Sequence, residues 1–361
     1  MMQEKRFRNQ ITWMMFLFSI LVIWVHSYNV ELFAAGTSWG PDWDRLAQIE
    51  TFWSVGVGQI AVPGFFLVSS YLFFRNFQLS KLAGKWKSRF FSVVIPYTVW
   101  NLLYYIGYVA ATRLPMVSRV IGKTQVPISV EEAARAVLQY SYAPIFWYLY
   151  QLIILLVLAP LIYGVVKNRV IGACYLAVLV TALYFHMDTG HPNTDALFYF
   201  SAAAYAAVHF RVWLETKGTN DRVMAGVAVW IVAIFCYGTM KDPAANVLWT
   251  IMYRLLAPIG LFLMISSVEV LMPRPWMRQS MFLYAIHFIV VRFMNKGAAI
   301  LSAKCVEAEL MTPEHLTWIA GLIYFAIPAV VVACSYLAAL VLSRWLPVLW
   351  RILSGGRSLN E

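Results

Sequence analysis

The segment IFWYLYQLIILLVLAPLIYGV, residues 145–165, decides the fold class of this chain. It carries no charged side chain, and it is long enough to cross a bilayer, since a spanning helix needs roughly 20 mostly apolar residues. Backbone groups inside hydrocarbon must be paired within the protein, which leaves helices or a closed barrel. The apolar residues run on without period-two alternation, so the segment predicts a transmembrane helix.

Similar apolar stretches recur along the whole chain, separated by short polar segments. Hydrophobic residues make up 61% of the sequence and charged residues only 12%, against about 25% charged in a typical soluble domain. The sequence therefore predicts an all-α, polytopic membrane helix bundle of about ten transmembrane helices. The expected spans are about 11–29, 55–74, 91–111, 145–165, 170–186, 196–213, 223–240, 248–270, 280–295 and 317–343.

No soluble stretch is long enough to bury a core of its own. We therefore expect one transmembrane domain over residues 1–353, followed by a disordered C-terminal tail over 354–361. The segments at about 30–54, 112–144 and 296–316 are long for simple connections. Loops of that length often act as lids or binding segments, and we expect these three on the outer face.

The distribution of basic residues predicts that both termini lie in the cytoplasm. With the N-terminus inside, 18 of the 28 lysines and arginines fall in cytoplasmic segments and 8 in outer segments. Loops rich in lysine and arginine stay on the cytoplasmic side, so this bias favours the orientation. The formal charge of +11 does not indicate nucleic-acid binding, because the basic residues do not form one folded basic face.

Two of the histidines within predicted spans are candidates for function, because ionisable groups are costly there. His26 is near the outer end of the first span, and a polar continuation through Asn29 follows it. In the ninth span, Ser280, Tyr284 and His287 are spaced to share one helical face. An imidazole can act as a general base near neutral pH, so either histidine is a catalytic candidate. The alternative is a neutral histidine bonded to a neighbouring helix.

Basic side chains provide a second set of candidate functional residues. The run from Arg75 to Arg89, which includes Lys87, holds five basic residues and no acid. It follows the positive-inside rule, but cations at a membrane edge can also bind a nucleotide's phosphates. Arg254 lies within a span and is a candidate for substrate binding or for a packing ion pair. Asn101 is a polar candidate for stabilising an oxyanion.

A group of metal-ligand residue types occurs in one outer loop. His186, Asp188, His191 and Asp195 have suitable side chains, but the segment is short, polar and turn-rich. We interpret it as a solvated loop and expect no metal.

At these residues the sequence resembles the acyltransferase-3 family of bacterial membrane acyltransferases, and the likeness runs across nearly the whole chain. It consists of the following segments: Val25-His26; Val62 to Phe73; the basic loop to Arg89; Ile95-Pro96-Tyr97 with Trp100 and Asn101; Phe146-Trp147 to Tyr150 with Ala159-Pro160; and Ser280 to His287. Met15 and Ser92 stand where the family usually has arginines. Gln151 and Leu152 stand where some members have a carboxylate.

The resemblance implies a membrane O-acyltransferase in the bacterial cytoplasmic membrane. Its donor would be acyl-CoA, with acetyl-CoA expected, and its acceptor a hydroxyl group of an envelope glycan or a similar molecule. By the same resemblance, His26 would be the catalytic base and Arg89 would handle the acyl donor, with Arg75 and Lys87 beside it. Trp147 belongs to a family motif and is a candidate supporting residue. The rival hypothesis is a transporter or small-molecule-binding membrane domain, although the sequence shows none of the inverted repeats common in transporters.

Overall fold

The computed structural model describes residues 2–115, 117, 118, 124–239, 246–266, 272–357 and 359. This part of the chain is helical and contains no strand, which confirms the predicted all-α membrane bundle. Eight helical segments in it are long and apolar enough to cross a membrane. They are Gln3–Ala34, Pro41–Phe74, Leu79–Ala111, Pro144–Val166, Asn220–Thr239, Val247–Ser266, Ser280–Glu307 and His315–Trp345.

The other two predicted spans correspond to α10 (Arg169–Tyr184) and α11 (Thr194–His209), which have 16 residues each. Both begin at an asparagine N-cap. The side chain of Asn168 accepts from the backbone N–H groups of Val170 and Ile171, and that of Asn193 accepts from Ala196. The count of ten spans and the location of the termini stay predictions.

The chain forms two compact units, each assembled from three separate stretches of sequence. Unit 1 consists of Met1–Val22, Gly56–Ser88 and Gln151–Arg278, and unit 2 of Ile23–Val55, Arg89–Tyr150 and Gln279–Glu361. Helix α1 (Met2–Ser27) and α9 (Trp147–Val166) therefore contribute to both units.

Unit 1 is built from helices that pack in pairs. Helix α4 packs against α11, and α13 packs extensively against α14. The second pair approaches closely through glycines, because a Cβ on Gly226 would lie 2.8 Å from the Met264 side chain and 3.0 Å from the carbonyl oxygen of Gly260. Besides parts of α1 and α9, the unit contains α4 (Ala61–Phe74), α5 (Leu82–Arg89, whose last residue belongs to unit 2), α10, α11, α12 (Arg211–Glu215), α13 (Asn220–Thr239) and α14 (Val247–Ser266).

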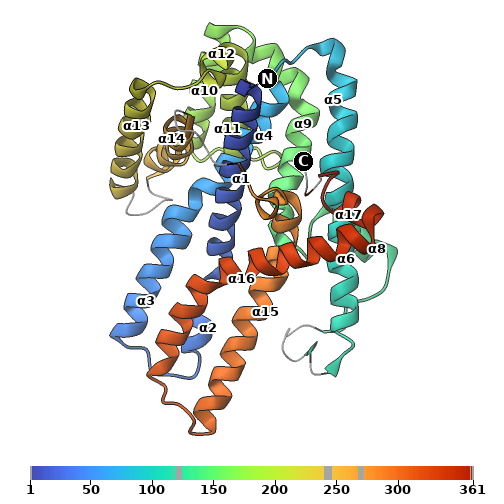
Figure 1. The fold of residues 1–361 in the computed structure, drawn as a ribbon, viewed down its shortest axis with the longest axis vertical. Helices are drawn as coiled ribbons and strands as arrows, with labels where there is room; N and C mark the ends of the chain where they lie inside the picture. Colours follow the sequence, from blue (N-terminus) through green and yellow to red (C-terminus); the bar gives the residue numbers. More distant parts are fainter. Residues whose placement is uncertain are drawn as a thin grey trace. The chain divides into compact units, whose positions relative to one another are not determined.

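Unit 2 centres on two long helices, α15 (Ser280–Glu307) and α16 (His315–Trp345), which run side by side (Figure 1). A buried apolar cluster joins α16 to the two helices that follow α1. It consists of Val30, Phe33, Ala34, Trp43, Leu46, Leu316 and Ala320. The remaining helices are α2 (Val30–Ala34), α3 (Pro41–Thr51), α6 (Ile95–Ala111), α8 (Val130–Leu138) and α17 (Pro347–Leu353).

The three predicted outer loops contain more helix than expected. Segment 30–54 forms α2 and α3, and α3 begins with Pro41 at its first position and Asp42 and Asp44 in its first turn. Proline and acidic side chains both favour a helix start. Segment 112–144 contains α8, capped by Ser129, and helix α15 continues twelve residues past the expected end of its span, to Glu307.

The predicted tail over 354–361 is described only in part, because Ser358, Asn360 and Glu361 lie outside the described residues. Ser354, Gly355 and Leu359 are buried. The disorder of this segment stays a prediction.

Candidate active site

The two intramembrane histidines lie next to each other in unit 2. The ring centroids of His26, at the end of α1, and His287, on α15, are 5.3 Å apart, and their planes meet at 39°. The ring of Phe288 stands edge-on to His26 at 5.6 Å. Both histidines are candidates from the sequence, but only the fold brings them together.

His287 presents an unsatisfied nitrogen atom. Its side chain is fully buried, and Nδ1 lies 2.5 Å from the carbonyl oxygen of Tyr284. A carbonyl oxygen only accepts, so Nδ1 carries the proton and Nε2 of the neutral ring is an acceptor. Among the described residues Nε2 has no hydrogen-bond partner. Buried polar atoms in native proteins are usually paired, so this atom marks a position where a hydroxyl group or water can bind.

A positive charge stands beside the histidine pair. Arg292 belongs to the same helix as His287, and its guanidinium carbon lies 4.7 Å from the centre of the Phe288 ring. The same ring contacts His26. Arg292 is thus a cation near the pair, and it favours negative charge developing there.

The chain directly after His26 is fixed by buried hydrogen bonds. The backbone N–H groups of Asn29 and Val30 donate to Oε2 of Glu50, at 2.8 and 3.2 Å. The side-chain amide of Asn29 donates to Oδ1 of Asn295 at 3.2 Å, and the amide of Asn295 donates to the carbonyl oxygen of Ser27 at 3.0 Å. This network holds the end of α1 against α3 and α15.

Glu50 and Asn295 were not among the residues predicted from the sequence. Glu50 is fully buried, and its second oxygen, Oε1, has no hydrogen-bond partner within the described chain. Glu50 follows the buried Trp43 and Leu46 at helical spacing, which puts it on the buried face of α3. That spacing is the signal in the sequence that could have identified it.

Other predicted residues of unit 2 pack around α15. The hydroxyl group of Tyr284 donates to the carbonyl oxygen of Ile145, and its ring lies 5.9 Å from that of Phe146. Trp147, next in the chain, is half-buried. Asn101 is fully buried, and its amide donates to the carbonyl oxygen of Tyr97 at 2.9 Å, while its Oδ1 is unpaired in the described structure.

Arg89 has a second arginine close to it that the sequence did not indicate as a site residue. Arg357 donates to the hydroxyl group of Ser280, and it is close enough to Arg89 for their positive charges to repel each other. Neither guanidinium group is within ion-pair distance of a carboxylate among the described residues. The two arginines therefore form a cationic site at the start of α15.

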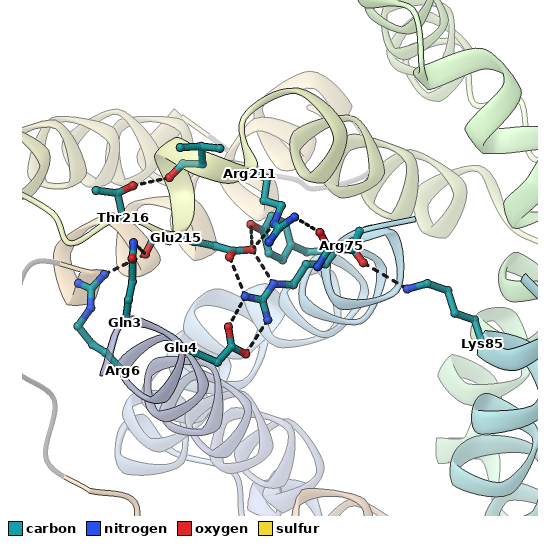
Figure 2. Close-up of polar contacts among 11 residues, drawn as sticks. Gln3, Glu4, Arg6, Arg75, Lys85, Arg211, Glu215 and Thr216 are labelled. Atoms are coloured by element: carbon teal, nitrogen blue, oxygen red, sulfur yellow. Dashed lines mark hydrogen bonds and ion pairs between the residues drawn. The ribbon is translucent and has the colours of Figure 1, made fainter. Parts of the chain in front are cut away.

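Arg75 lies in unit 1 and is neutralised by two carboxylates (Figure 2). It pairs with Glu4 at 2.5 Å and with Glu215 at 2.7 Å, and the hydroxyl group of Tyr71 also donates to Glu215 at 3.0 Å. The hydrogen bonds that Arg75 donates to these carboxylates raise its pKa above the ordinary value. Burial opposes ionisation of Glu215, but the bonds from Arg75 and Tyr71 outweigh it and lower the pKa of that carboxyl group.

The remaining predicted residues also lie in unit 1. Lys87 is exposed on α5. Arg254 donates to Oε1 of Gln59 at 2.7 Å and lines a polar cavity of 370 Å³ together with Asp188 and Asp195.

In the part of the chain that the structure describes, no group of three His, Cys, Asp or Glu side chains is arranged to hold a metal ion. Asp188 instead accepts from backbone N–H groups of its own loop.

The chain matches the model of a known protein family. A family model described as an acyltransferase domain covers residues 8–343, which is nearly the whole chain. The chain belongs to the acyltransferase-3 family. The family assignment makes it a multi-pass membrane acyltransferase, and both histidines and Arg89 fall within the matched residues, whereas Arg357 lies beyond them. No curated protein and no solved structure matched the chain.

Proposed function

We propose that the protein transfers an acyl group, with acetyl expected, from acyl-CoA to a hydroxyl group of an envelope glycan or a similar acceptor. The family supports acyl transfer in general. The observation that carries the proposal is the contact between His26 and His287, in which one buried imidazole nitrogen has no partner among the described residues.

In this proposal His26 is the general base. It removes the proton of the acceptor hydroxyl group while the oxygen attacks the carbonyl carbon of the thioester. The new C–O bond forms, the C–S bond breaks, and the sulfur leaves with the proton that His26 had taken up. The imidazole thereby returns to its neutral form.

His287 and Arg292 assist this step. Nε2 of His287 accepts a hydrogen bond from a second, neighbouring hydroxyl group of the acceptor and so holds the attacking oxygen beside His26. Negative charge develops on the carbonyl oxygen of the thioester and needs a positive or hydrogen-bonding partner. Arg292 is a cation close enough to act on His26 and is assigned this role.

The donor would bind through its phosphate groups. Arg89 and Arg357 are two neighbouring guanidinium groups without carboxylate partners in the described structure, a combination suited to phosphate. Lys87 and Arg75 are further candidates, although Arg75 would have to exchange Glu4 or Glu215 for a phosphate. Acyl-CoA is a co-substrate, and the mechanism requires no metal.

The proposed location is the cytoplasmic membrane of a bacterium, with acyl-CoA supplied from the cytoplasm and the glycan acceptor outside. The fold supports a multi-pass protein in contact with membrane lipid. His26 lies near the outer end of α1 in the predicted topology, which favours an external acceptor.

Release of free thiol from acetyl-CoA, measured on the detergent-purified protein with and without candidate glycans, tests the proposal. His26→Gln keeps a polar side chain but cannot act as a base, so it should lower turnover by at least about 10²-fold. His315→Gln is the matched control, because His315 is an exposed histidine of the same unit. Turnover near the wild-type level in His26→Gln would show that His26 is structural.

A further inference from the structure

Unit 1 contains a large apolar cavity that the proposed chemistry does not use. Its volume is about 690 Å³, within the range of about 300–1,000 Å³ typical of small-molecule sites. Helices α1, α4, α11, α12 and α14 line it. Ala203 and Ala206 on α11 line it with only a methyl group each, where larger side chains would fill part of the space.

The lining is almost entirely hydrocarbon. Its polar side-chain atoms are the indole N–H group of Trp213 and the hydroxyl group of Tyr71, and that hydroxyl group is already bonded to Glu215. An apolar cavity does not hold water well, because water needs two to four polar partners. In a protein surrounded by lipid, a hydrocarbon chain is the ligand with matching chemistry.

Two unneutralised cations stand at one end of this cavity. Arg6 directly precedes the lining residue Phe7 and donates to the carbonyl oxygens of Ser266 and Glu215, at 2.5 and 3.0 Å. Arg222 donates to the carbonyl oxygen of Thr216 at 2.7 Å, and its guanidinium carbon lies 4.4 Å from the ring centre of the lining residue Trp213.

These two arginines differ from their neighbours in the same region. Figure 2 shows Arg75 and Arg211 directed at Glu215, whereas Arg6 reaches a backbone carbonyl group instead. Within the described residues, neither Arg6 nor Arg222 has a carboxylate at ion-pair distance. They are close enough for their charges to act on each other, so an anion between them would relieve that repulsion.

We propose that the cavity holds an acyl chain of an anionic membrane phospholipid, whose phosphate group binds Arg6 and Arg222. The hydrocarbon lining matches the lipid's acyl chain, and the two neighbouring guanidinium groups match its charged headgroup. Trp213 joins the two parts, because it lines the cavity and stacks with Arg222. This inference is independent of acyl transfer, and a catalytically inactive protein would bind the same lipid.

Lipid titration of the delipidated protein in detergent tests the proposal. Dioleoyl phosphatidylglycerol should raise the melting temperature at lower concentration than dioleoyl phosphatidylcholine, which has the same chains without net charge. Arg222→Gln and Arg6→Gln should each weaken phosphatidylglycerol binding by about tenfold and remove the preference over phosphatidylcholine. Ala206→Trp places an indole ring in the cavity and should abolish stabilisation by both lipids. Gel filtration would confirm that each variant is folded before titration.

Arg169→Gln is the matched control, because Arg169 is an exposed arginine of the same unit. It should leave both titrations unchanged. Equal stabilisation of the wild-type protein by the two lipids would overturn the headgroup site, and this measurement needs no variant. Unchanged lipid binding in Ala206→Trp would show that the lipid's acyl chain does not occupy the cavity. Displacement of phosphatidylglycerol by palmitoyl-CoA at equimolar concentration would assign the cavity to an acyl donor and also overturn the proposal.

Discussion

At the scale of single residues, Glu50 has the most unusual environment in unit 2. A carboxyl group at a fully buried position is costly unless its oxygens are hydrogen-bonded. One oxygen of Glu50 accepts two backbone N–H groups from the turn after His26, and the other is unpaired among the described residues. Glu50 therefore has its main effect through the backbone of the residues that position His26.

Replacing Glu50 should separate this positioning effect from catalysis itself. Glu50→Ala leaves the N–H groups of Asn29 and Val30 without an acceptor and should lower stability by about 1–3 kcal/mol. Glu50→Gln retains one acceptor oxygen and should lose less. Melting temperature in detergent measures the stability, and thiol release measures turnover. If both variants melt at the wild-type temperature, the hydrogen bonds to Glu50 do not hold the end of α1.

At the scale of elements, the Glu215 cluster ties α12 to α4 and α1 in unit 1. The folded state lowers the pKa of Glu215, whose ordinary value is 4.5, so ionised Glu215 stabilises the fold above that value. We expect this stabilisation to be complete at neutral pH and to be lost as the pH falls below about 4.5. The melting temperature should drop more steeply with acid in the wild type than in Glu215→Gln. Parallel curves would show that Glu215 is not linked to folding.

Packing of α13 against α14 gives another expectation at this scale. Gly226→Leu would force the side chain into Met264 and the backbone of Gly260, and overpacking of this kind typically costs 1–3 kcal/mol. Gly238→Leu is the control on the same helix, because a Cβ there meets nothing within 4 Å. Melting temperatures of the two variants should differ by several degrees. Equal melting temperatures would mean that α13 and α14 are not in close contact.

At the scale of the whole molecule, the predicted orientation can be tested by labelling. Glu309, in the exposed turn after α15, is expected outside, so Glu309→Cys in a background without the four native cysteines should react with an impermeant thiol reagent on intact cells. A tag after Glu361 should be protected in the same cells. An accessible C-terminal tag would indicate an odd number of spans, with α10 and α11 the first helices to reconsider.

Hydrophobic length was sufficient to predict most of the long helices, because lipid requires continuous apolar sequence regardless of tertiary contacts. The same criterion did not predict α2 and α3, because their mixed polarity resembles that of a loop. His26 and His287 were identifiable as costly residues within spans, but their contact depends on how α1 and α15 pack. Arg357 and Asn295 were missed for a related reason. A polar residue at a helix end or in a tail gains significance only from its neighbours in space.

The interleaving of the two units affects how the protein is made. The bond from Asn295 to Ser27 joins residues 268 positions apart, so nearly the whole chain must be synthesised before this part of unit 2 can close. Until α15 leaves the ribosome and enters the bilayer, His26 at the end of α1 and Asn29 just after it lack their final neighbours on α15. The nascent protein therefore passes through a long interval with polar groups exposed inside the membrane. During this interval it would be a substrate for insertion chaperones and for quality-control proteases that recognise such groups.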